Sequence, residues 1–214
     1  ALKGNVDLWL FFMTIIVLSC IIGSACGFNN NINRQIEKKM ERTKNRALMV
    51  GLISGRNAIV FATFLGIIGS LILLLYTNLL TVIIAFVGFF VYVVLYSFWK
   101  CRTIYGTAIG SISGAVPPVI GYCAVSNQFD LGARILFLIM VFWQMPHFFS
   151  IAMYHFDDYV AAKLPVLPVQ KGMLRTKIHM VFYITGFILA SLMLTIFDYT
   201  GYVYLLVTMS IGVA

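Results

Sequence analysis

Polar side chains recur every four residues after the first long apolar run. Asn29, Asn33, Glu37 and Glu41 are each separated by three residues, which places them on one face of a helix. Their amide and carboxylate oxygens would form a row of ligands of the kind that Mg²⁺ takes together with phosphate oxygens. The segment holds no Gly or Pro as far as Arg46, so we expect the helix to continue without a break.

A basic row runs beside these oxygens. Its members are Arg34, Lys38 and Arg42, with Lys44 and Arg46 following. Guanidinium and ammonium groups bind the negative oxygens of phosphates, so the two rows together predict a site for a magnesium diphosphate. The competing interpretation is a solvated helix at the membrane edge, whose positive charge has only a topological role.

Two further clusters carry groups capable of chemistry. Asp157 and Asp158 follow the fifth apolar run and can supply carboxylates to the same metal. Trp143, Gln144 and His147 lie within that run, where polar groups usually face the interior of a helix bundle. Gln144 and His147 are three residues apart and should share a face, and a neutral imidazole is a common iron ligand. A purely structural histidine and ordinary helix-end acids are the alternatives.

The elements that must position these groups are apolar runs long enough to cross a bilayer. The 214 residues are 61% hydrophobic and 10% charged, whereas soluble domains have about 25% charged residues, so a water-soluble globule is excluded. The runs are Leu8–Phe28, Ala58–Tyr76, Leu79–Trp99, Tyr105–Val125, Ile135–Tyr154 and Met180–Phe197, followed by a shorter one at Tyr202–Ala214. We therefore expect an all-α integral membrane bundle with no inserted soluble domain.

Charge is distributed unequally between the two sets of connecting segments. Residues 29–57, 100–104 and 155–179 hold 13 of the 15 Lys and Arg, and such segments stay in the cytoplasm. The formal charge of +8 then reflects topology and not nucleic-acid binding. The basic side would face anionic lipid and anionic substrates.

Four stretches of the chain form a recognisable set. They are residues 26–56, with Met-Glu-Arg-Thr-Lys-Asn-Arg at 40–46; residues 105–122, with Ala-Val-Pro-Pro-Val-Ile-Gly at 115–121; Trp-Gln-Met-Pro-His-Phe at 143–148; and residues 156–172, which begin Phe-Asp-Asp-Tyr. In order and spacing, across nearly the whole chain, they resemble the heme O synthases, members of the UbiA-type intramembrane prenyltransferase family.

The resemblance implies a transferase that moves a farnesyl group from farnesyl diphosphate to a vinyl group of heme B. Water then adds, and the products are heme O and diphosphate; Mg²⁺ accompanies the diphosphate. The implied location is the cell inner (plasma) membrane, with the active face in the cytoplasm. Membrane lipid and a downstream heme A synthase or heme–copper oxidase are the expected partners. We expect residues 1–214 to form a single transmembrane domain that lacks the first and last of the family's roughly nine helices.

Position by position, the resemblance places the family's first acidic motif, Asn, Asp and Asp, on Asn29, Asn33 and Glu37. Asn33 offers a neutral amide in place of a carboxylate, and Glu37 is one methylene longer. The resemblance assigns metal or water contact to Asp158, with Asp157 beside it, and these two would carry more of the metal than usual. His147, with Gln144 and Trp143, is then the candidate site for contact with heme.

Two alternatives remain open. One is a UbiA-type enzyme that acts on an aromatic quinone precursor. The other is a non-catalytic membrane protein that binds heme or lipid, an interpretation favoured by Asn33 and Glu37.

Overall fold

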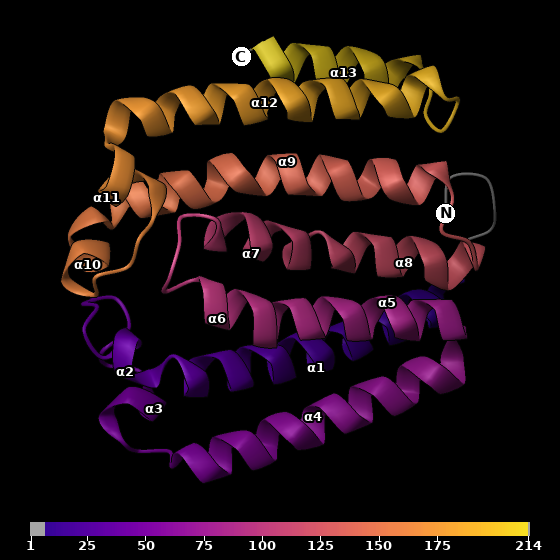
Figure 1. The fold of residues 1–214 in the computed structure, drawn as a ribbon. Coiled ribbons are helices and arrows are strands. Elements are labelled where there is room, and N and C mark those ends of the chain that lie inside the picture. The colour runs from indigo at the N-terminus through magenta and orange to yellow at the C-terminus, as the bar shows by residue number, and fades with distance from the viewer. Residues whose placement is uncertain (1–6, 214) are drawn as a thin grey trace.

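The computed structural model describes residues 7–213, and this part of the chain is built from helices without strands (Figure 1). In chain order the elements are α1 (Leu8–Ile32), α2 (Arg34–Glu37), α3 (Ala47–Val50), α4 (Gly55–Tyr76), α5 (Leu79–Phe90), the π-helical η1 (Val91–Tyr96), α6 (Ser97–Trp99), α7 (Gly106–Gly114), α8 (Val116–Ser126), α9 (Leu131–Tyr154), α10 (Phe156–Ala161), α11 (Leu167–Lys171), α12 (Met173–Ile196) and α13 (Tyr202–Val213).

Six helical stretches are long and apolar enough to cross a membrane. They are Leu8–Ile32, Gly55–Tyr76, Leu79–Trp99, Gly106–Ser126, Leu131–Tyr154 and Met173–Ile196, and each contains most of a run predicted from the sequence. The seventh run corresponds to the shorter α13. The predicted all-α membrane bundle is confirmed, and the protein is a multi-pass membrane protein.

Side-chain caps start several of these spans. Asp7, Ser54, Asn78 and Asp130 each accept a hydrogen bond from a backbone N–H in the first turn of the helix that follows. Such caps satisfy amides that have no partner within the helix. The caps therefore determine where the chain turns back into the membrane.

Small residues allow neighbouring spans to approach closely. A Cβ added to Gly27 would lie 2.9 Å from the Cβ of Ala62, and one added to Gly66 would lie 2.7 Å from Oγ of Ser24, so α1 and α4 pack backbone to backbone. A Cβ added to Gly110 on α7 would lie 3.1 Å from Cε2 of the Tyr96 ring, so this glycine lets the ring pack against the helix.

Two spans depart from regular α-helix. The third span includes the π-helical segment η1, which places Tyr92 and Tyr96 in a stack with centroids 5.4 Å apart. The fourth span is divided at Ala115 into α7 and α8, just before Pro117 and Pro118. Proline has no amide donor, so the helical hydrogen bonding is interrupted at this point of the span.

The basic connecting segments lie at one end of the bundle. Figure 1 shows α2 and α3 at the same end as α10, α11 and the connection from α6 to α7. Segments far apart in the sequence therefore meet at the polar end of the bundle.

Candidate active site

The first helix ends earlier than predicted. α1 stops at Ile32, Asn33 is its C-cap, and only one short turn, α2, follows. The side-chain amide of Asn33 donates to the carbonyl oxygen of Asn29 at 2.9 Å. Such local bonds compete with the helix ladder. Beyond α2, Thr43 folds back and donates to the carbonyl oxygen of Glu37 at 2.6 Å, so the prediction of an unbroken helix to Arg46 is wrong.

The break divides the predicted row of oxygen ligands. Asn29 and Asn33 are 4% and 2% exposed, and neither lines the polar cavity described below. The Asn29 amide donates to Oγ of Ser97 at 2.8 Å, and the amide oxygen of Asn33 lies 3.9 Å from Sγ of Cys101. The two amides therefore tie α1 to the end of the third span.

Glu37 is the member of the row that reaches the cavity. Its side chain is buried, and Oε2 lies 3.0 Å from Nη1 of Arg46. Glu41 instead points outward and pairs with Lys44 at 2.6 Å. Among the described residues, Glu37 provides the only carboxylate in the cavity wall.

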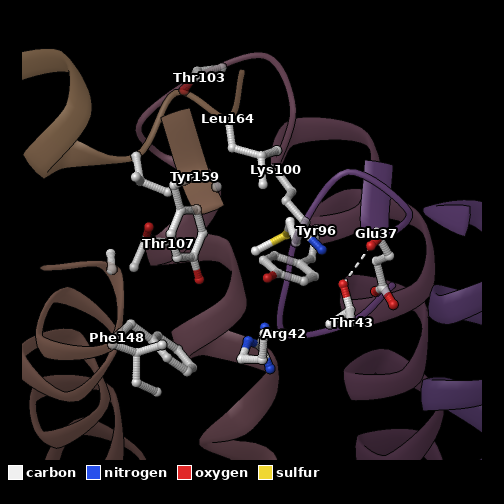
Figure 2. Close-up of a pocket in the computed structure, with 15 residues that line it drawn as sticks. Glu37, Arg42, Thr43, Tyr96, Lys100, Thr103, Thr107, Phe148, Tyr159 and Leu164 are labelled. Carbon is white, nitrogen blue, oxygen red and sulfur yellow. Dashed lines mark hydrogen bonds between the residues drawn. The ribbon is translucent and has the colours of Figure 1, made fainter. Parts of the chain in front are cut away.

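The polar cavity has a volume of about 120 Å³ and lies where the basic segments meet (Figure 2). Its cations are Arg42 and Lys100, beside the carboxylate of Glu37. Its hydroxyl groups come from Thr43, Tyr96, Thr103, Thr107 and Tyr159, and the other lining residues are Met40, Gly106, Phe148, Ile151, Ala152, Leu164 and Val166. Two cations and several hydroxyl donors suit an anion with many oxygens.

Lys100 and Tyr96 were not among the residues predicted from the sequence. They lie four residues apart at the end of the third span, with Nζ of Lys100 5.6 Å from the centroid of the Tyr96 ring. Burial lowers the pKa of Lys100, and the negative charge of Glu37 partly opposes this effect. A tyrosine in the last turn of an apolar span, followed four residues later by a lysine, is the sequence signal that could have identified the pair.

The remaining predicted cations do not line this cavity. The predicted basic row depended on an unbroken helix, so its members separate once α1 has ended. Arg42 alone lines the polar cavity, while Arg46 reaches it through Glu37. Arg34 lies against the start of α4, with its Nη1 3.7 Å from a Cβ built on Gly55, and Lys38 and Lys44 are exposed.

Asp158 holds the segment that carries Arg42. Its Oδ1 accepts the backbone N–H of Glu41 at 2.8 Å, and its Oδ2 accepts that of Arg42 at 3.3 Å. Asp157 is exposed, and Nδ1 of His155 lies 3.9 Å from Oδ2 of Asp158. Asp158 therefore contacts the segment between α2 and α3 through the backbone of Glu41 and Arg42.

Apolar contacts join the same two segments. Met40, Ala162 and Leu164 form a buried cluster, with Ile36 and Tyr159 packed around it. Because the phenol of Tyr159 is also removed from water, its pKa is raised, and it stays a hydrogen-bond donor toward the cavity.

A second, apolar cavity lies deeper in the bundle. Its volume is about 270 Å³, and none of the described residues around it is charged. It is lined by Leu18, Ile21, Ile22, Ala25, Cys26, Ala85, Gly88, Phe89, Tyr92, Gly110, Ser113, Gly114, Val116, Pro117, Ile120, Gln144 and Phe148. The side chain of Phe148 lines both cavities.

The predicted heme cluster on α9 is divided between two faces. Gln144 is buried against Gly114, whereas Trp143 and His147 are exposed. The rings of Trp143 and His147 stack with centroids 5.2 Å apart and planes 12° apart. Gln144 and His147 are neighbours three positions apart on α9, but α7 covers Gln144 and leaves His147 exposed.

Comparison with known proteins identifies the family. The profile of the UbiA prenyltransferase family matches residues 1–214. The chain belongs to the UbiA prenyltransferase family. A protein of Protochlamydia amoebophila named protoheme IX farnesyltransferase is 56% identical over 99% of this chain and 75% of its own length. A protein of Sodalis glossinidius with the same name is 53% identical over 100% of this chain and 72% of its own length.

Solved structures confirm the UbiA fold. A UbiA homolog from Aeropyrum pernix superposes with a TM-score of 0.78 at 15% identity, covering 99% of this chain and 79% of that one. A UbiA homolog from Archaeoglobus fulgidus, bound to GPP and Mg²⁺, gives a TM-score of 0.76 at 13% identity, covering 98% and 74%. The resemblance seen in the sequence motifs is confirmed by the family match and by the two relatives named above.

Proposed function

We propose that the chain transfers the farnesyl group of farnesyl diphosphate to a vinyl group of heme B, with addition of water, to give heme O and diphosphate. Relatives that are 56% and 53% identical over almost the whole chain are named protoheme IX farnesyltransferase. These names favour heme as the acceptor over an aromatic quinone precursor.

The observation that carries the proposal is that one residue, Phe148, lines both a polar and an apolar cavity. Farnesyl diphosphate has an anionic head on an apolar chain, so it would need two such cavities side by side. Arg42 and Lys100 would bind the diphosphate with the hydroxyl groups around them, and the apolar cavity would receive the chain. The cations would also stabilise the negative charge that grows on the leaving diphosphate.

The polar cavity suits a magnesium ion that arrives with the diphosphate. Mg²⁺ is commonly bound through one or two carboxylates plus phosphate oxygens, and Glu37 offers one buried carboxylate at the cavity wall. The described residues contain no group of three His, Cys, Asp or Glu arranged to hold a metal, which agrees with a metal shared with substrate. When bound, the ion would withdraw charge from the leaving oxygen.

The other predicted ligands take different parts in this proposal. Asn29 and Asn33 support the base of the loop, and Asp158 holds its tip, through the bonds described above. Asp157 is exposed beside them and does not line the polar cavity, so it takes no part in binding the ion in this proposal.

Heme would bind against the exposed part of α9. His147 and Trp143 present a stacked imidazole and indole there and line neither cavity, and a flat porphyrin can stack on such rings. The basic end of the bundle would face the cytoplasm from the inner membrane, within reach of anionic lipid. The product would pass to a heme A synthase or a heme–copper oxidase.

The test is a product assay. Membranes that contain the protein are incubated with heme B, farnesyl diphosphate and Mg²⁺, and the extracted hemes are examined by mass spectrometry. We expect heme O, and none when Mg²⁺ is chelated. If heme B is recovered unchanged while it still binds the membranes, the non-catalytic alternative is favoured.

A further inference from the structure

Aromatic rings stand at the boundary between the two cavities. Phe148, in the C-terminal half of α9, lines both the polar and the apolar cavity. Tyr96 lines the polar cavity and Tyr92 the apolar one, and their rings stack with planes 15° apart. Figure 2 shows the Phe148 ring reaching from α9 into the space that the Tyr96 ring enters from the third span.

The reacting carbon of an allylic diphosphate must lie at this boundary. Its C1 atom is bonded directly to the diphosphate oxygen. If that head binds Arg42 and Lys100 and the chain occupies the apolar cavity, C1 lies where the cavities meet. When the C1–O bond breaks, the electron pair leaves with the diphosphate, and C1 and C3 share a positive charge.

On the side of the farnesyl chain, the protein groups around this positive charge are uncharged. The described residues around the apolar cavity include no carboxylate, so an anionic side chain there does not stabilise the cation. The face of an aromatic ring carries partial negative charge and attracts a cation, most strongly where water is excluded. The rings at the boundary are therefore the groups suited to this task.

The position of Phe148 is held by the packing one turn earlier. Gln144 is 6% exposed, and its side-chain amide lies against Gly114, so a Cβ added there would force the amide to move. Because residues four apart share a helix face, this contact between α9 and α7 keeps the Phe148 ring at the boundary. Phe149, its neighbour, is instead packed in a buried cluster with Met145 and Leu167.

We propose that Phe148 is a further catalytic residue, whose ring face, together with the Tyr92–Tyr96 stack, stabilises the allylic cation at the junction of the two cavities. The inference rests on the proposed farnesyl transfer and adds a residue to it. A role in packing alone would require the volume of the side chain but not its π electrons.

Fluorinated phenylalanines at position 148 separate these two roles. Mono-, di- and trifluorinated rings keep nearly the same shape but lose π density step by step. We expect kcat to fall with each step, by about thirtyfold in total for a desolvated cation–π contact, with KM for farnesyl diphosphate nearly unchanged. Phe148→Leu should lose a similar factor, and Phe148→Trp should restore part of it.

The control is the same fluorinated series at Phe182, which is 71% exposed on α12 and lines neither cavity. If kcat stays constant along the fluorinated series at position 148 in an otherwise active enzyme, or if only KM changes, the role of Phe148 is overturned and the proposed function is left intact. Failure of the unmodified protein to form heme O would overturn the proposed function itself, and the inference with it.

Discussion

Replacement of Asp158 by Asn tests how the loop over the polar cavity is held. Both carboxylate oxygens accept backbone N–H groups, from Glu41 at 2.8 Å and from Arg42 at 3.3 Å. An asparagine can accept one of these bonds, but its NH₂ group then faces the other N–H donor. The variant should therefore loosen the segment that presents Arg42 and Thr43 to the cavity.

The size of the effect follows from these two bonds. A hydrogen bond to a charged group contributes about 1.5–3 kcal/mol, and the short bond to Glu41 is the stronger of the two. The Asp158 side chain is 11% exposed, but Glu41 and Arg42 are exposed residues, so we take the lower value and count about one bond lost. About 1.4 kcal/mol corresponds to a tenfold change, which we expect in KM for farnesyl diphosphate.

The assay compares Asp158→Asn with Asp157→Asn, since Asp157 is exposed and forms no hydrogen bond or ion pair among the described residues. Heme O formation is measured against farnesyl diphosphate and, separately, against Mg²⁺. We expect KM to rise about tenfold for Asp158→Asn with little change in the Mg²⁺ concentration for half-maximal rate. A wild-type KM combined with a raised Mg²⁺ requirement in both variants would refute the loop-holding role and identify the pair as metal ligands.

Three further predictions concern other parts of the site. Glu37→Gln removes the only described carboxylate of the polar cavity, so the Mg²⁺ requirement should rise and kcat should fall by about a hundredfold, whereas an unchanged Mg²⁺ titration would contradict the proposed ligand. Burial lowers the pKa of Lys100, so its positive charge is present below that pKa and is lost as the pH rises through it. We expect kcat/KM to decline over that pH range in the wild type, and Lys100→Arg should move the decline to higher pH. The same decline at alkaline pH in both proteins would argue against this assignment. Gly114→Ala places a Cβ against the Gln144 side chain, which should cost about 1–3 kcal/mol of stability and lower Tm, whereas Gly121→Ala meets nothing within 4 Å and should leave Tm nearly unchanged.

Membrane topology could be predicted from the sequence because hydropathy is a local property. Each of the six spans follows from a run of apolar residues that must avoid water. The loops rich in Lys and Arg fall at one end because the spans alternate in direction.

The composition of the candidate site could not be predicted in the same way. A spacing of four placed Asn29, Asn33 and Glu37 on one face, but it could not show that the helix stops at Ile32. The chain turns away after that point, where Met40 packs in a cluster with distant residues and Thr43 bonds back to Glu37. Likewise, the sequence placed His147 beside Gln144, but only the packing of α7 on α9 determined which of them is buried.

The sequence by itself therefore determined the membrane spans, the basic end and, through its motifs, the family. The tertiary structure decided which of the many polar groups at that end share a cavity. Asp158 and Glu41 are 117 positions apart in the chain, and Lys100 belongs to a third segment. No periodicity relates three such segments; they meet because burial of the spans brings their ends together.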